Sequence, residues 1–555
     1  MSNRTRLSVT IAAILACAAH STASAQTSET QSLQELRNTV INLLDGLVKR
    51  GVITREQAEQ MVADAQSKAE TDAKAKADVD AAEKDAVRVT YVPQIVRDEI
   101  SKQVRAELKP EVTKEVLAQA KEEKWGVPGA LPDWVSGMQL FGDIRLREER
   151  YDQEMPTVPS DCGLGPDFCV LDYQAINEAG GIAVNDLSSI YRNITTERVR
   201  TRVRLRAGLK AQVSDGITAV VRLATGNPGD PVSTNQTLGQ YGSRFDIAVD
   251  QAYLRFDAGA HSELPWMTVY GGRNPNPFVS TDLVWDADLN FDGVAGTWRL
   301  GFGGAGAEPS YAFITAGAFP LQEIELSTDD KWLYAGQLGV DWSWADRARF
   351  KFAAAYYYFE NITGIRNPVL DSRVFDYTAP KFMQKGNTLF DIRNDNNTST
   401  YLFALATEYH LANATAMLEV PMGSYKLFVT GDYVRNLGYD ESQVLAIAAV
   451  DRTTDGRERS TGYQGEIGFG TARTGSRGDW RAYVAYKHLE RDAVVDAFTD
   501  SDFNLGGTDA KGYVLRADWW FRNRAALSLR YISTKSIDAV PVNVDTAMLD
   551  INGSF

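Results

Sequence analysis

The chain has 555 residues, of which 44% are hydrophobic and 24% charged, and its formal net charge is −15 at pH 7. This acidic balance argues against nucleic acid as a partner, because the phosphates would repel the chain. After residue 25 no apolar run reaches roughly 18 residues, so the sequence predicts no transmembrane helix beyond that point.

Residues 1–25 have the features of a secretory signal peptide. Arg4 and Arg6 give a positive start, an apolar stretch follows, and Ala23-Ser24-Ala25 fits the small-residue cleavage pattern, so we expect cleavage after Ala25. An exported chain without a membrane-spanning helix is periplasmic, secreted or in the outer membrane. Only a closed β-barrel can satisfy its backbone groups in lipid without helices.

Residues 26–125 are predicted to form a helical periplasmic segment. One stretch has the 3-4-3-4 spacing of a coiled-coil seam, with a single amphipathic helix packed on its own chain as the alternative. The residues of this seam are Leu33, Leu36, Val40, Leu43 and Leu47. Gly51 ends the helix, and residues 54–57 form a capping box that opens the next one. Glycines and prolines within residues 126–137 then indicate a linker.

Two cysteines remain once the signal peptide, which contains Cys17, is removed. Cys162 and Cys169 lie in a segment rich in Gly, Pro and Asp and would close a small loop. An oxidising compartment favours a disulfide between them. Metal binding is the weaker alternative because no His or further Cys is nearby, and we expect neither a metal nor a cofactor.

From Trp134 onward the spacing of hydrophobic residues changes from the helical period of about 3.6 residues to the strand period of two residues. The clearest case is residues 198–213, where apolar residues occupy the odd positions. The even positions carry a ladder of cations: Arg198, Arg200, Arg202, Arg204, Arg206 and Lys210. In a soluble sandwich the apolar face would meet a second sheet. In a membrane barrel it would meet lipid, and the arginines would line an aqueous lumen.

The number of such segments favours the barrel. Candidate strands lie near 138–150, 197–213, 216–227, 246–257, 267–274, 291–301, 309–320, 332–344, 348–359, 400–411, 424–437, 460–473, 478–491, 510–521, 524–534 and 546–555. Their connections alternate between tight turns and long polar loops, as in bacterial barrels with an even number of strands. We therefore expect an all-β transmembrane antiparallel barrel of about 16 strands over residues 138–555.

Three stretches resemble the Putative porin family of proteobacterial outer membranes: residues 47–54 (LVKRGVIT), 271–278 (GGRNPNPF) and 286–293 (DADLNFDG). The resemblance implies a passive, often homotrimeric channel in contact with outer-membrane lipid and lipopolysaccharide. The last strand ends in Phe555 and resembles the C-terminal pattern recognised by the barrel assembly machinery.

The third long connection, residues 275–290, is the candidate constriction. In general porins the equivalent loop folds inward and narrows the pore. Acidic residues gather here: Asp282, Asp286, Asp288 and Asp292, the last three sharing one face if the strand extends through them. Facing the arginine ladder, they would create a transverse field across the pore. The alternative is a solvated strand face, balanced by lipopolysaccharide or neighbouring loops.

An enzymatic function is not expected. Beyond the signal peptide the only histidines are His261, His410 and His488. His261 and His410 lie at or near predicted periplasmic connections, and His488 has no obvious nucleophile near it. We expect a porin for small hydrophilic solutes or ions. Two alternatives are a substrate-specific channel of the anion or phosphate type, and a structural tether between the outer membrane and the cell wall.

Overall fold

The computed structural model describes residues 137–156, 170–182, 190–260, 262, 264–302, 308–344, 348–369, 373–395, 397–451 and 457–555, with scattered residues between 54 and 71. The chain divides into two compact units, Met1–Lys114 and Glu115–Phe555. In the first unit the described residues from Glu56 to Thr71 are helical and exposed. The signal peptide, the 33–47 seam, nearly all of the linker, Cys162 and Cys169 lie outside the described residues.

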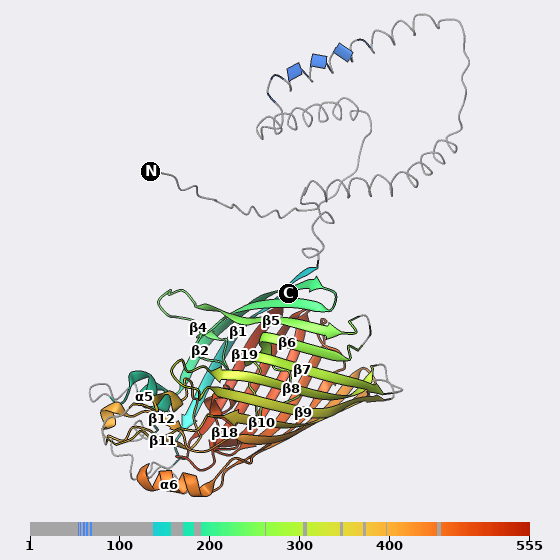
Figure 1. The fold of residues 1–555 in the computed structure, drawn as a ribbon. Helices are drawn as coiled ribbons and strands as arrows, with labels where there is room; N and C mark the ends of the chain where they lie inside the picture. Colours follow the sequence, from blue (N-terminus) through green and yellow to red (C-terminus); the bar gives the residue numbers. More distant parts are fainter. Residues whose placement is uncertain are drawn as a thin grey trace, which may run out of the picture. The chain divides into compact units, whose positions relative to one another are not determined.

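The second unit contains a closed antiparallel β-barrel of sixteen strands (Figure 1). The strands are β1 (Met138–Glu154), β2 (Arg198–Ser214), β3 (Ile217–Thr225), β5 (Ile247–Ala258), β6 (Met267–Pro275), β7 (Asn290–Phe302), β8 (Ser310–Gln322), β9 (Lys331–Trp344), β10 (Ala348–Glu360), β13 (His410–Met422), β14 (Tyr425–Asn436), β15 (Thr461–Thr471), β16 (Trp480–Leu489), β17 (Ala510–Arg522), β18 (Ala525–Ser536) and β19 (Asn543–Ser554). β1 pairs with β2 on one side and with β19 on the other, so the sheet has no free edge.

Smaller elements lie in the connections. They are β4 (Gln236–Thr237), β11 (Leu389–Asp391), β12 (Phe403–Leu405), α5 (Tyr173–Ala179), α6 (Glu441–Asp451), η3 (Asp376–Thr378), η4 (Thr398–Thr400), η5 (Asp496–Phe498) and η6 (Phe503–Leu505). None of the helices in the described part of the chain is long and apolar enough to cross a membrane.

The predicted barrel is confirmed, and all but one of its strands lie where the alternation placed them. The strand predicted over 400–411 is wrong. The wall strand is β13, beginning at His410, and residues 403–405 instead form the β11–β12 hairpin inside a loop. The error has a physical cause: in the first half of β13 the outward residues are Ala412, Ala414 and Ala416, so its alternation is weak there, whereas Phe403–Leu405 is strongly apolar.

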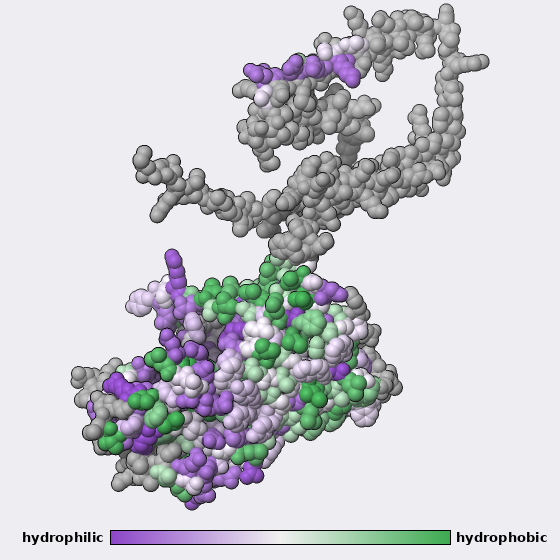
Figure 2. Space-filling model, in the orientation of Figure 1, coloured by the Kyte–Doolittle hydropathy of each residue, from purple (hydrophilic) through white to green (hydrophobic). Residues whose placement is uncertain are grey.

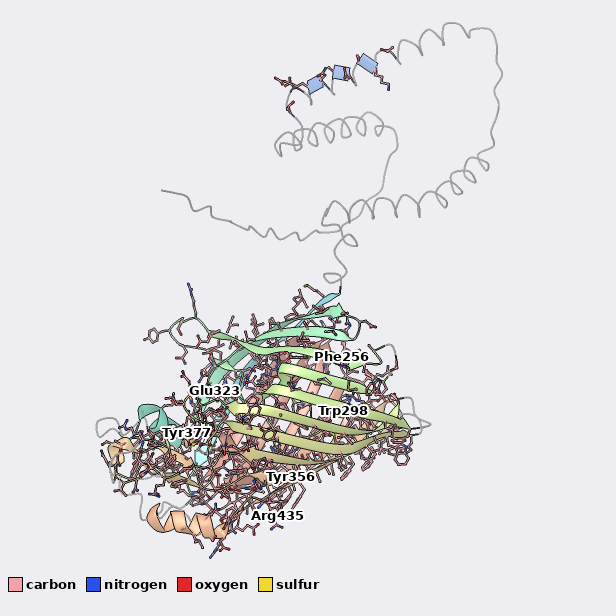
Figure 3. All side chains as sticks on the ribbon, in the orientation of Figure 1. Phe256, Trp298, Glu323, Tyr356, Tyr377 and Arg435 are labelled. Carbon is pink, nitrogen blue, oxygen red and sulfur yellow. The ribbon has the colours of Figure 1, made fainter. Side chains whose placement is uncertain are left out.

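Outward side chains make the wall apolar. Leu140, Leu300 and Leu338 are 79%, 75% and 62% exposed on strands whose alternate residues face inward. Phe256, Trp298 and Tyr356 lie on the same outer face (Figure 3). Hydrophobic residues alternate with residues of intermediate hydropathy over the visible wall, while strongly hydrophilic ones gather near α5 and α6 (Figure 2). This is the surface that lipid requires of a barrel.

Outward aromatic residues gather toward both ends of the strands. Those near the short turns include Trp266, Trp342, Tyr425, Trp480 and Trp519. Tyrosines predominate toward the long loops: Tyr334, Tyr356, Tyr433, Tyr463 and Tyr513. Amphipathic rings are favoured at membrane–water interfaces, so the two bands mark the expected limits of the hydrocarbon layer.

The connections alternate in length around the barrel, as predicted. One end has short turns, such as Asp215-Gly216, where Gly216 adopts φ +69°. The other end has eight loops, all but loops 4 and 8 longer than any turn at the first end. They are numbered in chain order as loop 1 (155–197), loop 2 (226–246), loop 3 (276–289), loop 4 (323–330), loop 5 (361–409), loop 6 (437–460), loop 7 (490–509) and loop 8 (537–542).

Loops 3, 5 and 7 pack together against the inner face of β7–β10. Leu283 and Trp285 of loop 3, Leu405 of loop 5 and Val494 of loop 7 are fully or almost fully buried in one hydrophobic cluster. The indole of Trp285 packs edge-on against the ring of Tyr357 from β10, with ring centroids 5.1 Å apart. This core fixes loop 3 within the barrel.

Candidate pore constriction

The inner face of β1 and β2 carries a continuous row of charges. Strand alternation sends Asp143, Arg145, Arg147 and Glu149 of β1 inward, like the arginines of β2. Four pairs lie directly opposite each other: Asp143 and Arg206, Arg145 and Arg204, Arg147 and Arg202, and Glu149 and Arg200. Like charges therefore meet in the middle of the row, and opposite charges at its two ends.

Most of these arginines are held by carboxylates. Asp143 accepts hydrogen bonds from Arg204 Nη2 at 2.8 Å and from Arg206 Nε at 2.7 Å. Glu149 accepts one from Arg200 Nε. Arg145 differs, because its Nη2 donates to Asn235 Oδ1 at 2.6 Å and it makes no ion pair with a described residue. Arg145 is therefore the least neutralised cation of this wall.

Loop 3 crosses the lumen from one wall to the other. Near its start, Thr281 donates from Oγ1 to Asp432 of β14 at 2.6 Å. Asp282 lies 3.1 Å from Lys487 Nζ of β16. At its far end, Asp288 Oδ1 is 3.4 Å from Arg204 Nη1 and 3.2 Å from Arg206 Nη1. The acids of the loop thus face cations on two separate parts of the wall.

Loop 7 lies beside loop 3 and adds more acids. The Asp286 amide donates to the carbonyl of Phe498 at 2.8 Å, and the Ser501 amide donates to Asp286 Oδ2 at 2.9 Å. Asp500 pairs with Arg530 of β18 at 3.1 Å. The two loops are therefore joined by backbone and side-chain bonds, and both line the same cavity inside the barrel.

Arg147 connects loop 7 to the wall. Its side chain is 4% exposed, and Nε and Nη2 form a two-pronged contact with Asp550 of β19 at 2.7 and 2.9 Å. Its Nη1 donates to Asp502 of loop 7 at 3.0 Å. Asp502 also pairs with Arg530 Nη1 at 2.9 Å. Fork-like contacts of this kind are among the stronger ion pairs in proteins.

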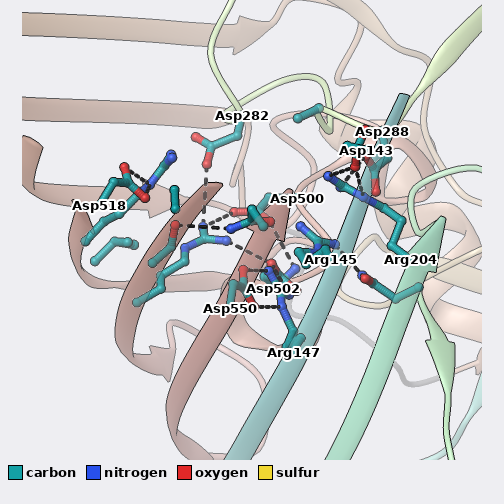
Figure 4. Close-up of a pocket in the computed structure, with 18 of the residues that line it drawn as sticks. Asp143, Arg145, Arg147, Arg204, Asp282, Asp288, Asp500, Asp502, Asp518 and Asp550 are labelled. Atoms are coloured by element: carbon teal, nitrogen blue, oxygen red, sulfur yellow. Dashed lines mark hydrogen bonds and ion pairs between the residues drawn. The ribbon is translucent and has the colours of Figure 1, made fainter. Parts of the chain in front are cut away.

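These groups line a cavity of about 520 Å³ (Figure 4). The charges in its lining are nearly balanced, with eight cationic and nine acidic side chains. The cations are Arg145, Arg147, Arg204, Arg206, Lys487, Arg516, Arg524 and Arg530. The acids are Asp143, Asp282, Asp286, Asp288, Glu466, Asp500, Asp502, Asp518 and Asp550.

The loop acids differ in how readily they ionise. Burial, with the nearby carboxylates of Asp500 and Asp288, raises the pKa of Asp286 well above its usual value. The guanidinium groups of Arg204 and Arg206 outweigh burial at Asp288 and lower its pKa. Lys487 and Arg530 lower the pKa of Asp282 in the same way. Asp288 and Asp282 therefore stay ionised and carry the negative charge of loop 3.

Only some of the residues predicted for the site come together here. Arg204, Arg206, Asp282, Asp286 and Asp288 line the 520 Å³ cavity. Arg198 and Arg200 line a separate cavity of about 690 Å³ near the loops, and Arg202 Nη2 donates to the carbonyl of Asn235. Lys210 is exposed near the short turns.

Asp292 lies apart from the other acids of its region. It pairs with Arg273 Nη1 at 2.8 Å and borders a different cavity. The predicted strand face shared by Asp286, Asp288 and Asp292 is wrong, because β7 begins only at Asn290. Residues 286–289 are loop, so their side chains do not alternate with those of the strand.

The sequence reading missed several charges of the cavity. Arg145 and Arg147 have the same period of two as the β2 ladder, and that signal could have revealed them. Asp500 and Asp502 lie in an irregular loop and have no such periodicity. Lys487 and Arg530 belong to no ladder of alternating cations on their strands, so only the closed barrel shows that they face loop 3.

A closed sixteen-strand barrel with an apolar outer wall and a charged lumen is a transmembrane β-barrel of the bacterial outer-membrane type. A family model described as Putative porin matches residues 37–555, and the chain belongs to this family. The protein is accordingly an outer-membrane channel protein of Gram-negative cells.

Several solved structures resemble the chain over about three quarters of its length. OprB of Pseudomonas putida is 12% identical, with 76% of this chain and 94% of that chain covered and a TM-score of 0.41. The channel DcaP of Acinetobacter baumannii is 11% identical, with 75% and 97% covered and a TM-score of 0.37. A loop-deleted OmpT of Vibrio cholerae is 9% identical, with 76% and 100% covered and a TM-score of 0.37. A comparison with curated proteins gives no match.

Proposed function

We propose that the protein is a porin, a water-filled channel for passive diffusion of small hydrophilic solutes and ions, and that its selectivity is set where loops 3 and 7 face β1 and β2. The observation that carries this proposal is the path of loop 3. Its Asp288 meets Arg204 and Arg206 on one wall, while its Asp282 meets Lys487 on another. Charges fixed across a narrow passage act on every solute that crosses it.

Charge balance favours a general porin over a channel specific for phosphate or another anion. The cavity has one more acidic than cationic side chain, and the raised pKa of Asp286 brings the two sets closer to balance. A phosphate-type channel would need a clear surplus of cations in the same space. The near balance supports only weak ion selectivity with a strong transverse field.

Single-channel recording in a planar bilayer tests this proposal. Purified protein should give stepwise conductance, and a reversal potential near zero under a tenfold salt gradient. A reversal potential close to the limit for anions would instead support the anion-specific alternative. If protein shown to be inserted gave no conductance steps, the channel function itself would be contradicted. The structural tether would then remain as the function.

We also propose that residues 26–125 form a periplasmic segment that strengthens a homotrimer of barrels. The heptad-like spacing of residues 33–47 supports this role. Deleting residues 28–124 should weaken the oligomer on native gels while leaving a barrel whose migration still changes on heating. An oligomer of unchanged stability would show that contacts between barrels are sufficient.

A disulfide between Cys162 and Cys169 in loop 1 is proposed as well. Both would be oxidised after export, and no other cysteine follows the signal peptide. Mass spectrometry of non-reduced peptides from outer-membrane protein should find them linked. Two free thiols in that material would contradict the pairing.

The proposed orientation places loops 1–8 outside the cell, against lipopolysaccharide, and the short turns in the periplasm, as in other bacterial barrels. Phe555 ends the chain at the short-turn end, where its backbone pairs with Gly142 and its side chain is 53% exposed. An exposed aromatic terminus fits recognition by the barrel assembly machinery.

A further inference from the structure

A second cavity, of about 290 Å³, lies behind the constriction loop. It is enclosed by the loop ends of β6–β9 together with parts of loops 2, 3, 5 and 7. Apolar and aromatic side chains dominate its lining, including Leu289, Phe291, Phe319, Phe382 and Phe498. A concave apolar space of this size, near the lower limit for ligand pockets, suits one small organic molecule rather than a hydrated ion.

Two lysines border this apolar space. Lys331 is 4% exposed, and its Nζ donates to the carbonyls of Thr378 at 3.1 Å and Ala379 at 2.9 Å. It forms no ion pair with a described residue, although an ammonium group buried without a counter-charge is costly. Lys381 lines the same cavity, and its positive charge repels that of Lys331. A bound anion would relieve both effects.

The other charged groups of the lining do not supply that anion. Asp292 is already paired with Arg273 at 2.8 Å. Asp496 accepts from the Gln384 amide at 3.1 Å, and burial raises its pKa to about 7, so near neutral pH it is only partly ionised. The cavity therefore keeps a surplus of positive charge beside its aromatic side chains.

We propose that this cavity binds a small aromatic carboxylate, with its ring among Phe291, Phe319 and Phe498 and its carboxylate at Lys331 and Lys381. The apolar lining accounts for the ring, and the two ammonium groups, which have no ion pair among the described residues, account for the acid. Inorganic anions lack the apolar part, and neutral aromatic molecules lack the charge, so neither satisfies both halves of the site.

Loop 3 separates this site from the constriction. Asp286 and Asp288 line the 520 Å³ cavity, whereas Trp285 and Leu289, from the same short segment, line the apolar cavity. The two cavities have no lining residue in common. A molecule in the apolar cavity would therefore contact the back of the constriction loop without occupying the passage.

Isothermal titration calorimetry of the full-length protein in detergent tests the site, with benzoate as the probe. Acetate carries the charge without the ring, and benzyl alcohol carries the ring without the charge. Benzoate should bind saturably, and each of the other two should bind at least roughly tenfold more weakly, because each lacks one half of the contacts. Equal affinity for benzoate and acetate would overturn the proposal.

Substitutions locate the binding. Lys331→Met and Lys381→Met should each weaken benzoate binding, Lys331→Met by roughly tenfold or more, and Lys331→Arg should keep most of the affinity. Lys535→Met removes the same charge from an exposed position that does not line the cavity and should leave binding unchanged. Heat-modifiable gel migration verifies that each variant is folded, and the exposed Lys381 keeps the test open if Lys331→Met does not fold.

Two results would contradict the site while leaving the porin function intact. One is unchanged benzoate affinity in folded Lys381→Met and Lys331→Met. The other is binding that disappears in Arg204→Ser with Arg206→Ser but persists in the lysine variants, which would place benzoate in the constriction. Conductance of the parent protein is measured separately and does not depend on either outcome.

Discussion

Replacing Arg204 and Arg206 with Ser should move the reversal potential strongly toward cations in a low-salt gradient. The change removes two positive charges from the constriction and leaves Asp143 and Asp288 without their guanidinium partners. One charge close to an ion is worth on the order of 1–4 kcal/mol at an effective dielectric constant near 20. Even the lower value changes local ion occupancy several-fold, since about 1.4 kcal/mol is tenfold.

The control for this pair lies on the same strand. Arg198→Ser with Lys210→Ser removes two cations from β2, but neither residue lines the 520 Å³ cavity, and both are exposed. This variant should keep the parent's reversal potential. The shift in Arg204→Ser with Arg206→Ser should fade near 1 M salt, where the Debye length is about 3 Å. If Arg204→Ser with Arg206→Ser kept the parent's reversal potential at low salt, these two arginines would not border the narrow part of the pore.

The loop acids allow a finer comparison within the same experiment. Asp288→Asn should move the reversal potential toward anions, because nearby arginines keep Asp288 ionised. Asp286→Asn should have a smaller effect, because burial raises the pKa of Asp286. Its carboxyl group is therefore neutral more often than that of Asp288, and replacing it with an amide removes less negative charge. Equal shifts in the two variants would contradict this difference in charge.

Arg147→Met should destabilise the barrel more than any substitution on the exposed wall. The side chain is almost fully buried and neutralises Asp550 and Asp502; without it, Asp502 keeps its pair with Arg530, but Asp550 loses its two-pronged partner. Removing one partner of a buried ion pair costs about 3–5 kcal/mol. We expect a lower temperature for the heat-induced change in gel migration, and looser attachment of loop 7 seen as faster proteolysis within residues 490–509.

Arg150→Met is the matched control for Arg147→Met. Arg150 lies three residues further along β1 and pairs with Glu197 at 2.8 Å, but both side chains are more than half exposed. Exposed pairs contribute about 0–1 kcal/mol, so this variant should unfold close to the parent temperature. Similar losses in the two variants would show that burial of the Arg147 network does not account for its effect.

The sequence by itself determined the barrel. Lipid contacts one face of every strand and water the other, so each strand must alternate along its length, and the pattern is visible without any knowledge of its neighbours. The Arg198–Arg206 ladder, the sixteen segments and the alternating connections all follow from this rule. It failed at β13, where the outward residues of the first half are alanines and give little contrast.

The tertiary structure alone decided which charges meet. Loop 3 is irregular, so no periodicity tells which of its acids turn toward the lumen, and the strand face assumed for Asp292 does not exist there. Asp500 and Asp502 join the site because loop 7 packs on loop 3. Lys487 and Arg530 join it because loop 3 crosses the lumen and brings Asp282 to β16 and β18. Contacts between residues hundreds of positions apart depend on closure and loop packing, which local alternation does not encode.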